Sequence, residues 1–183
     1  MKNLLKFSFL AILCCVSPAV AVPKETGLAL QQAPSFTGTW VLDRAASDPM
    51  EEMMTAEGLS AIERKMYSRL SEKLEIEQAP AEVVIKTTTS IVTDTQHLVM
   101  DGSPQTRDVF RLGSVTSRTN WDPDHKTLVT LTDLTGGDGN PAHGTVRRSI
   151  EDKGQTLLQV LTLEVSDHRV ISARRIYRRQ KAS

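Results

Sequence analysis

The stretch TLLQVLTLEV, residues 156–165, decides the fold class because it belongs to a long series of similar stretches. From residue 74 onward, runs rich in Val, Ile, Thr and Leu recur about every ten residues, with turn residues between them. Many short strands at even spacing, without helical patterns among them, are typical of an antiparallel barrel or sandwich. The chain is therefore predicted to be mostly β. With a first strand in FTGTWVLD (36–43) there are ten expected strands, the others being LEIEQ (74–78), EVVIKTTTSIV (82–92), HLVM (97–100), TRDVFRL (106–112), VTSRTNW (115–121), TLVTLTDL (127–134), TVRRSIE (145–151), TLLQVLTLEV (156–165) and RVISARRIY (169–177).

The faces of these strands mix polar and apolar residues. Residues two apart share a face of a strand, and in 156–165 this places Gln159 between Leu157 and Leu161. An unpaired amide or hydroxyl costs roughly 1–3 kcal/mol in a dry core. A barrel wide enough to hold water and a ligand avoids that cost, although edge strands show the same pattern.

One region, between the first strand and the second, has helical signals. The residues Asp48 to Glu51 resemble a helix start, with a capping residue followed by proline. Gly58 then interrupts the helix, and Ser60 to Glu63 form a second capping box. The pattern predicts two short amphipathic helices, the first with Met50, Met53 and Met54 on one face and the second with Ile62, Met66, Leu70 and Leu74 at intervals of four.

The first 21 residues have the pattern of a secretory signal peptide. Lys2 and Lys6 precede an apolar run over residues 7–16, and Ala19 and Ala21 form an A-x-A cleavage pattern. The run is too short for a spanning helix, which needs about 20 apolar residues. We expect cleavage after Ala21 and an exported mature protein, with residues 22–35 as an N-terminal linker and residues 36–180 as the barrel domain.

The two cysteines, Cys14 and Cys15, both lie in this signal. Lipoprotein anchoring at either is not expected, because Leu13 precedes Cys14 where a small residue is favoured. The mature chain then has no cysteine for a disulfide, a thiol nucleophile or a zinc site. It keeps 20 basic residues against 22 acidic ones, a formal charge of −2, which argues against nucleic acid as a partner.

Two motifs resemble the fatty-acid-binding protein family. The segment GTWVLD (38–43), followed by MEEMMTAEGLSAIERK (50–65), is similar to the family's G-T-W-x-L signature and the helical motif after it. LEIEQAPAEVVIKTTTS (74–90) resembles the family's second and third strands, and RRIYRR near the end matches its R-x-Y ending. The chain thus resembles a secreted bacterial-type member of this family, or a lipocalin-like relative within the same calycin superfamily.

The resemblance implies a fold and a ligand site. The fold would be a ten-stranded antiparallel flattened β-barrel around a water-containing cavity, with a helix–turn–helix lid inserted after the first strand. Arg175 and Tyr177 would hold a ligand carboxylate together with an arginine on an earlier strand. That arginine is either Arg147 or Arg148. Arg147 matches the family spacing slightly better, but the motif does not separate the two.

The alternation of residues in the last strand is compatible with this site. Ile171, Ala173, Arg175, Tyr177 and Arg179 share one face, which is predicted to point inward. A guanidinium and a phenol there could hold one anion. The alternatives are that these arginines are solvated, that they form cross-strand pairs such as Glu164–Arg174, or that they form a basic strip facing anionic lipid.

The remaining candidate residues have simpler interpretations. Trp40 is predicted to plug the closed end of the barrel. Asp122 to His125 resembles a hairpin turn more than a calcium loop, and TGGDGNPAHG (135–144) a long turn. The methionines Met50, Met53, Met54 and Met66 are expected to pack the helices or to form a soft apolar portal.

These patterns predict a binding protein. The favoured function is a secreted or periplasmic carrier, acting as a monomer, for a fatty acid or a similar small hydrophobic anion, with possible transient membrane contact. The alternative is a ligand-free β-barrel interaction module of the cell envelope with a filled interior. No enzyme activity, cofactor or metal site is expected, because no G-x-S-x-G motif occurs and the histidines lie at strand ends and in loops.

Overall fold

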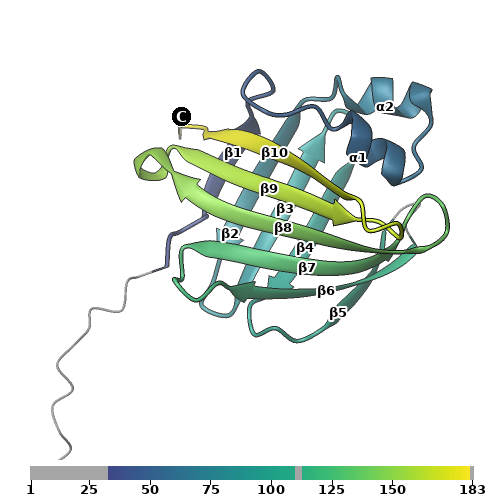
Figure 1. Cartoon of the computed structure of the whole chain (residues 1–183). Coiled ribbons are helices and arrows are strands. Elements are labelled where there is room, and N and C mark those ends of the chain that lie inside the picture. The colour runs from purple at the N-terminus through teal and green to yellow at the C-terminus, as the bar shows by residue number, and fades with distance from the viewer. Residues whose placement is uncertain (1–32, 110–112, 182–183) are drawn as a thin grey trace, which may run out of the picture. The chain divides into compact units, whose positions relative to one another are not determined.

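The computed structural model describes residues 33–109 and 113–181. In these residues the chain forms one ten-stranded antiparallel sheet and two short α-helices (Figure 1). The predicted mostly-β class and the ten-stranded barrel are confirmed. The predicted signal peptide, most of the linker and part of the predicted strand at 106–112 lie outside the described residues.

The elements follow one another in simple order. The strands are β1 (Gly38–Leu42), β2 (Glu72–Gln78), β3 (Glu82–Thr89), β4 (Thr93–Val99), β5 (Gln105–Val109), β6 (Gly113–Trp121), β7 (Thr127–Thr135), β8 (Pro141–Glu151), β9 (Thr156–Glu164) and β10 (Val170–Arg179). The helices α1 (Glu51–Ala56) and α2 (Ala61–Tyr67) lie between β1 and β2, and a short 3₁₀ helix, Asp152–Gly154, follows β8.

The sheet curves into a nearly closed barrel. Its strand order is β4-β3-β2-β1-β10-β9-β8-β7-β6-β5. Strand β1 pairs with both β2 and β10, so the first and the last strand lie side by side. The outermost strands, β4 and β5, share no ladder among the described residues. Helices α1 and α2 lie together at one end of the barrel (Figure 1).

Strand β10 confirms the predicted alternation. Ile171, Ala173 and Tyr177 are buried on the inward face, with 1–4% of their surface exposed. Arg174 and Arg178 on the other face are exposed. The period of two in a strand thus places Arg175, between Ala173 and Tyr177, on the inner side of the barrel.

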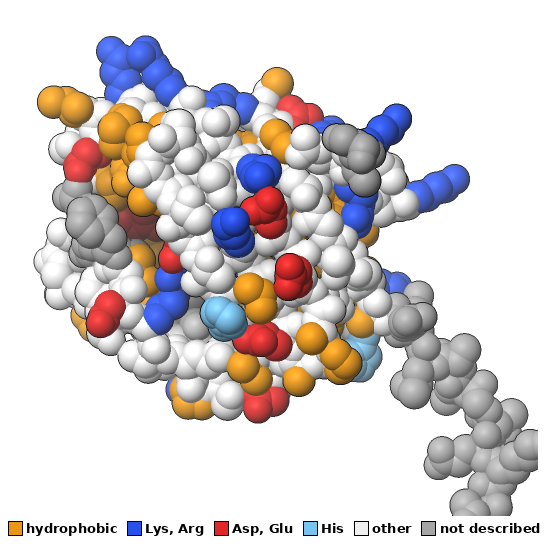
Figure 2. Space-filling view, turned by 180° about the vertical axis from the view of Figure 1, so that it is seen from behind, with side chains coloured by type: hydrophobic (Ala, Val, Ile, Leu, Met, Phe, Trp, Pro, Cys, Tyr) orange, Lys and Arg blue, Asp and Glu red, His pale blue; other side chains and the backbone are white. Residues whose placement is uncertain are grey.

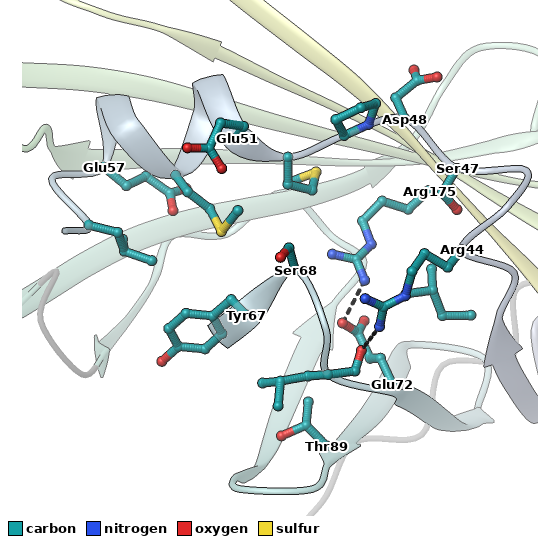
Figure 3. A pocket seen from close by; sticks show the side chains of 16 residues that line it. Arg44, Ser47, Asp48, Glu51, Glu57, Tyr67, Ser68, Glu72, Thr89 and Arg175 are labelled. Carbon is teal, nitrogen blue, oxygen red and sulfur yellow. Dashed lines mark hydrogen bonds and ion pairs between the residues drawn. The ribbon is translucent and has the colours of Figure 1, made fainter. Parts of the chain in front are cut away.

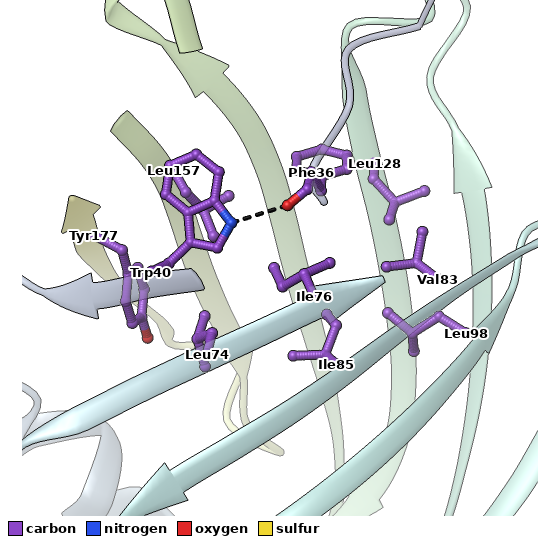
Figure 4. Close-up of a cluster of buried hydrophobic side chains, with 10 residues drawn as sticks. All are labelled: Phe36, Trp40, Leu74, Ile76, Val83, Ile85, Leu98, Leu128, Leu157 and Tyr177. Carbon is purple, nitrogen blue, oxygen red and sulfur yellow. Dashed lines mark hydrogen bonds between the residues drawn. The ribbon is translucent and has the colours of Figure 1, made fainter. Parts of the chain in front are cut away.

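An apolar core lies inside the barrel, between its strands (Figure 4). Trp40 is completely buried, and its Nε1 donates a hydrogen bond of 2.9 Å to the carbonyl of Phe36. Arg179 stacks over the Trp40 ring at 4.1 Å. The predicted burial of Trp40 in the core is confirmed, and its role in closing one end of the barrel stays a prediction. The core consists of Phe36, Trp40, Leu74, Ile76, Val83, Ile85, Leu98, Leu128, Leu157 and Tyr177.

The two helices begin in different ways. The predicted capping box of α2 is confirmed, because the Ser60 side chain accepts from the Glu63 amide and the Glu63 carboxylate accepts from the Ser60 amide. Helix α1 begins at Glu51, and the Asp48 carboxylate binds Arg174 of β10 instead of capping the helix. The predicted Asp48 cap is therefore wrong, because a partner on β10 takes its carboxylate.

The predicted apolar stripe of the second helix is wrong in two respects. Helix α2 ends at Tyr67, so Leu70 follows it and Leu74 belongs to β2. No residue of α2 is buried, and Ile62 is 83% exposed. Ile62 and Met66 are therefore exposed, and the predicted residues do not form one buried helical stripe.

The lid, which we define as α1, α2 and the turn between them, is held through α1 and the turn. Met53 of α1 is buried against a second apolar cluster that includes Leu163 and Ile171. At the turn, the Gly137 amide donates a hydrogen bond of 2.9 Å to the carbonyl of Ala56. A Cβ on Gly137 would lie 2.4 Å from the Gly58 Cα, so the two backbones touch.

The loop that contains Gly137 is shorter than predicted. Strand β8 begins at Pro141, and its first residues pair with the end of β7. The long turn predicted over residues 135–144 is therefore confined to residues 136–140. The predicted turn at Asp122 to His125 is confirmed as the β6–β7 hairpin.

Candidate functional site

A cavity of about 550 Å³ lies between the lid and the mouth of the barrel (Figure 3). Clefts of roughly 300–1,000 Å³ are typical of small-molecule sites. Its walls come from the end of β1, the loop that leads to α1, both helices, the ends of β2 and β3, and β10. The lining residues are Leu42, Arg44, Ser47, Asp48, Pro49, Met50, Glu51, Met54, Glu57, Leu59, Tyr67, Ser68, Leu70, Glu72, Thr89 and Arg175.

An ion pair lies at the barrel side of the cavity. Arg175 donates from Nη2 to Oε2 of Glu72 at 2.7 Å, as Figure 3 shows. Tyr177 donates from its hydroxyl to the other carboxylate oxygen, Oε1, at 2.6 Å. The side chains of Arg175 and Glu72 are only 18% and 19% exposed. One internal carboxylate thus occupies both members of the predicted anion-binding pair.

Burial keeps the Tyr177 hydroxyl protonated. It raises the pKa of the Tyr177 phenol far above its usual value, so the hydroxyl stays protonated and donates to Glu72. The Nε of Arg175 is buried and has no hydrogen-bond partner among the described residues. The guanidinium therefore has unused donor capacity inside the barrel.

A second arginine points into the barrel from β8. Arg148 is 6% exposed, and its Nη1 donates to Thr130 Oγ1 at 3.0 Å. Thr130 in turn lies 3.1 Å from the Thr119 hydroxyl. Burial lowers the pKa of Arg148 to about 10, which still leaves it charged at neutral pH. Its Nε is unpartnered, and no carboxylate pairs with it among the described residues.

The sheet register places the two internal arginines in one row. Arg148 lies opposite Gln159 on β9, and Gln159 lies opposite Arg175 on β10. Gln159 is itself buried, at 7% exposure. We call Glu72, Arg148, Gln159, Arg175 and Tyr177 the internal polar cluster.

Arg147 and Arg148, which the sequence left as alternatives, lie on opposite faces of β8. The Arg147 side chain is 48% exposed, and its Nη2 donates to Asp122 at 2.9 Å on the outside of the barrel. Among the two, Arg148 is therefore the one that faces the interior. Ligand contact by Arg175, Tyr177 and Arg148 stays a prediction.

The other arginines of β10 also have partners. On the outer face Arg174 binds Asp48, Arg178 binds Asp43 at 3.0 Å, and each arginine lowers the pKa of its aspartate. Arg179 lies on the inner face at the end of the strand and donates to the carbonyl of Gly154 at 2.6 Å. All three arginines are thus matched by nearby acceptors.

The four methionines of the predicted portal have different positions. Met50 and Met54 line the cavity. Met53 packs in the second apolar cluster below α1. Met66 is 42% exposed and does not line the cavity. A portal role for these residues stays a prediction.

Of the charged cavity residues only Arg175 was predicted for the site from the sequence; Arg44, Asp48, Glu51, Glu57 and Glu72 were missed. Glu72 shares a strand face with Leu74 and Ile76, and a charge on such a face was a usable signal. Arg44 donates to the carbonyl of Leu70, and Glu57 lines the cavity at the end of α1. Burial raises the pKa of Glu57 above its usual value. Nothing in the local pattern distinguished Arg44 or Glu57 from solvated residues.

Three further observations concern the described residues. None of the helices in residues 33–109 and 113–181 is long and apolar enough to cross a membrane. The same residues contain no group of three or more His, Cys, Asp or Glu side chains placed to hold a metal ion. The space-filling view from behind shows basic and acidic side chains dispersed among hydrophobic ones (Figure 2).

Comparison with known proteins identifies solved structures with a similar fold. No protein-family model and no curated protein matches the chain. Among solved structures it is similar to lipid binding protein 8 of Caenorhabditis elegans, with 16% identity and a TM-score of 0.66 over 81% of this chain and 99% of that one. A fatty-acid-binding protein from the brain of Drosophila melanogaster has 22% identity and a TM-score of 0.61 over 79% of this chain and 99% of its own.

A third similar structure is human cRBP IV, with 22% identity and a TM-score of 0.63 over 80% of this chain and 99% of that one. At these identities the likeness shows the fold. The predicted resemblance is thus confirmed at that level: the domain has a barrel fold similar to that of these fatty-acid-binding and lipid-binding proteins.

Proposed function

We propose that the protein is an exported carrier for a small hydrophobic ligand with an acidic head group, such as a fatty acid. The observation that carries the proposal is the cavity of about 550 Å³ under the lid, beside an internal polar cluster rich in arginine. Its apolar wall includes Leu42, Met54 and Leu59, which suit an acyl chain. Similar structures include proteins described as fatty-acid-binding and lipid-binding.

The charge inside the barrel supports an acidic ligand. The internal polar cluster contains two guanidinium groups, of Arg148 and Arg175, and a single carboxylate, of Glu72. Burying a charge without a counter-charge costs several kcal/mol. A ligand carboxylate near Arg148 would offset that cost, and the lid would cover the bound chain.

The export part of the proposal rests on the signal pattern in residues 1–21. Expression of the full chain in a bacterial host, followed by fractionation and intact-mass analysis, tests it. The expected product is an exported chain that begins at Val22 and is monomeric. Retention of the uncleaved chain in the cytoplasm would contradict this part alone.

Ligand binding is tested with a fluorescent fatty acid and a matched pair of variants. Arg148→Met removes the buried charge, and Arg147→Met makes the same change on the outer face of β8. We expect Arg148→Met to weaken binding by about 1.5–3 kcal/mol, the range for a charged hydrogen bond, and Arg147→Met to leave it unchanged. Native mass spectrometry should also show a co-purifying acyl ligand.

The carrier proposal fails if the wild-type protein binds no acyl ligand in either measurement. If Arg147→Met and Arg148→Met change the affinity equally, then the charge of Arg148 does not contribute to ligand binding. In that case the apolar wall alone would hold the ligand.

A further inference from the structure

The carboxylate of Glu72 is held in the way a bound acid would be held. Each of its oxygens accepts one short hydrogen bond, from Arg175 at 2.7 Å and from Tyr177 at 2.6 Å. A guanidinium and a phenol that converge on one carboxylate form a strong, charge-assisted arrangement. The protein therefore supplies its own acid to the pair that was predicted to bind a ligand's acid.

The register explains how Glu72 reaches this place. Trp40 of β1 lies opposite Leu74 and Val41 opposite Lys73, so continuing the ladder brings Leu42 level with Glu72. On its other side Leu42 lies opposite Tyr177. Glu72 and Tyr177 therefore flank the last residue of β1, and both side chains lie on the inner face of the sheet.

We infer that Glu72 is a built-in competitor for acidic ligands, and that it sets how strongly the cavity prefers an acid over a neutral molecule of the same shape. Glu72 and Arg175 both line the cavity. An acid that approaches Arg175 must displace a carboxylate that already neutralises it, whereas a neutral chain need not. The inference deepens the proposed function and rests on it for the identity of the ligand.

A purely structural role for the Glu72–Arg175 salt bridge predicts a different effect on acid affinity. If Glu72 only braces β2 against β10, then removing its charge lowers stability without improving the binding of acids. If Glu72 competes, removing its charge frees Arg175 and Tyr177 for the ligand. The two interpretations differ in the sign of the change in acid affinity.

The first experiment compares Glu72→Gln with Glu75→Gln. Glu75 is on the same strand and makes ion pairs with Lys73 and Lys86 at 3.0 Å and 3.2 Å outside the barrel. Its variant therefore removes the same charge from the same strand but leaves the interior unchanged. A saturated fatty acid and the matching fatty alcohol compete with a fluorescent probe. We expect Glu72→Gln to raise the acid's affinity about tenfold, the effect of one charged hydrogen bond, and to leave the alcohol within about twofold. Glu75→Gln should change neither.

The second experiment does not depend on acyl binding. Glu72→Ala leaves space for a small carboxylate, so sodium acetate should raise its melting temperature in a saturable way when compared with sodium chloride at equal ionic strength. The wild-type protein and the double variant Glu72→Ala, Arg175→Met should not show this rise, because one is already filled and the other has lost its cation.

The outcomes separate the two proposals. Acetate rescue without acyl binding by any variant overturns the carrier function and supports Glu72 as the occupant of an anion site. Acyl binding by the wild type without rescue of Glu72→Ala overturns the inference alone. An acid affinity that Glu72→Gln does not raise above the Glu75→Gln control also overturns it.

Discussion

The two ends of the barrel are formed by the same strands but are filled differently. Toward one end, Trp40, Phe36 and Leu157 are at most 1% exposed and form a continuous core. At the other end, β2 and β3 border a cavity of about 550 Å³ with charged groups in its wall. We infer that the packed end supplies most of the stability of the barrel. The end that borders the cavity therefore does not need a filled interior.

The two helices show the same contrast on a smaller scale. Helix α1 buries Met53 and Met54, whereas α2 buries no residue and exposes Ile62, Met66 and Tyr67. Isolated helices this short are not stable in water, and tertiary packing must hold them. The lid therefore depends on α1 and on the glycine contact at its turn.

The largest expected effect comes from opening the core. Trp40→Ala should lower the free energy of unfolding by about 3–5 kcal/mol, because it leaves a cavity and removes buried contacts. Leu59→Ala, in the cavity wall, should cost less than half as much, because its side chain already borders open space. Denaturant unfolding of both variants checks this. Equal losses would show that the two ends contribute equally.

Much of the fold could be predicted from local sequence. The alternation of β10 and the Ser60 capping box each depend on residues a few positions apart. The Asp48 cap failed because its partner, Arg174, is 126 residues away in the chain. A local pattern does not contain such a partner.

The candidate site was predicted only in part for the same reason. The inward side of Arg175 and Tyr177 followed from strand periodicity, but Glu72 binds Arg175 from 103 positions away. The choice between Arg147 and Arg148 depends on which face of β8 turns inward. Arg148 shares a face with Val146 and Ile150, so the period of two was a usable signal that the family motif alone did not provide.

An intermediate effect is expected from the contact that fixes the lid. Gly137→Ala forces a Cβ to within 2.4 Å of the Gly58 backbone, and overpacking of this kind costs about 1–3 kcal/mol. The packing of the apolar core should not change. We expect faster amide hydrogen exchange in α1 and α2 and faster release of a bound fluorescent fatty acid, with little change in the exchange of β1 and β2.

Gly136→Ala is the matched control, one residue earlier in the same loop. Its Cβ would meet the Asp138 side chain at 3.1 Å, and the tip of that side chain can move. Lid exchange in this variant should resemble the wild type. If both variants loosen the lid equally, then the loop as a whole holds it, and the Gly58–Gly137 contact has no special part.

The smallest expected effect concerns the cavity wall itself. Burial raises the pKa of Glu57, so its ionised form is less favourable in the folded protein than in the unfolded chain. The cost is absent below the usual glutamate pKa, grows as the pH rises toward the raised folded value, and is complete above it. Glu57→Gln should therefore raise the melting temperature at pH 7 by about one to two degrees, the shift that a few tenths of a kcal/mol produces in a domain of this size.

The pH dependence of that gain separates burial from other causes. At about pH 4, where the glutamate is largely protonated in both states, the difference between Glu57→Gln and the wild type should shrink toward zero. Differential scanning fluorimetry at the two pH values measures it, with Glu51→Gln as a control in the same wall, because Glu51 is exposed and paired with Arg64 at 2.6 Å. A gain of equal size at both pH values would mean that the gain does not come from the buried charge of Glu57, and no gain at either pH would mean that the carboxylate is solvated.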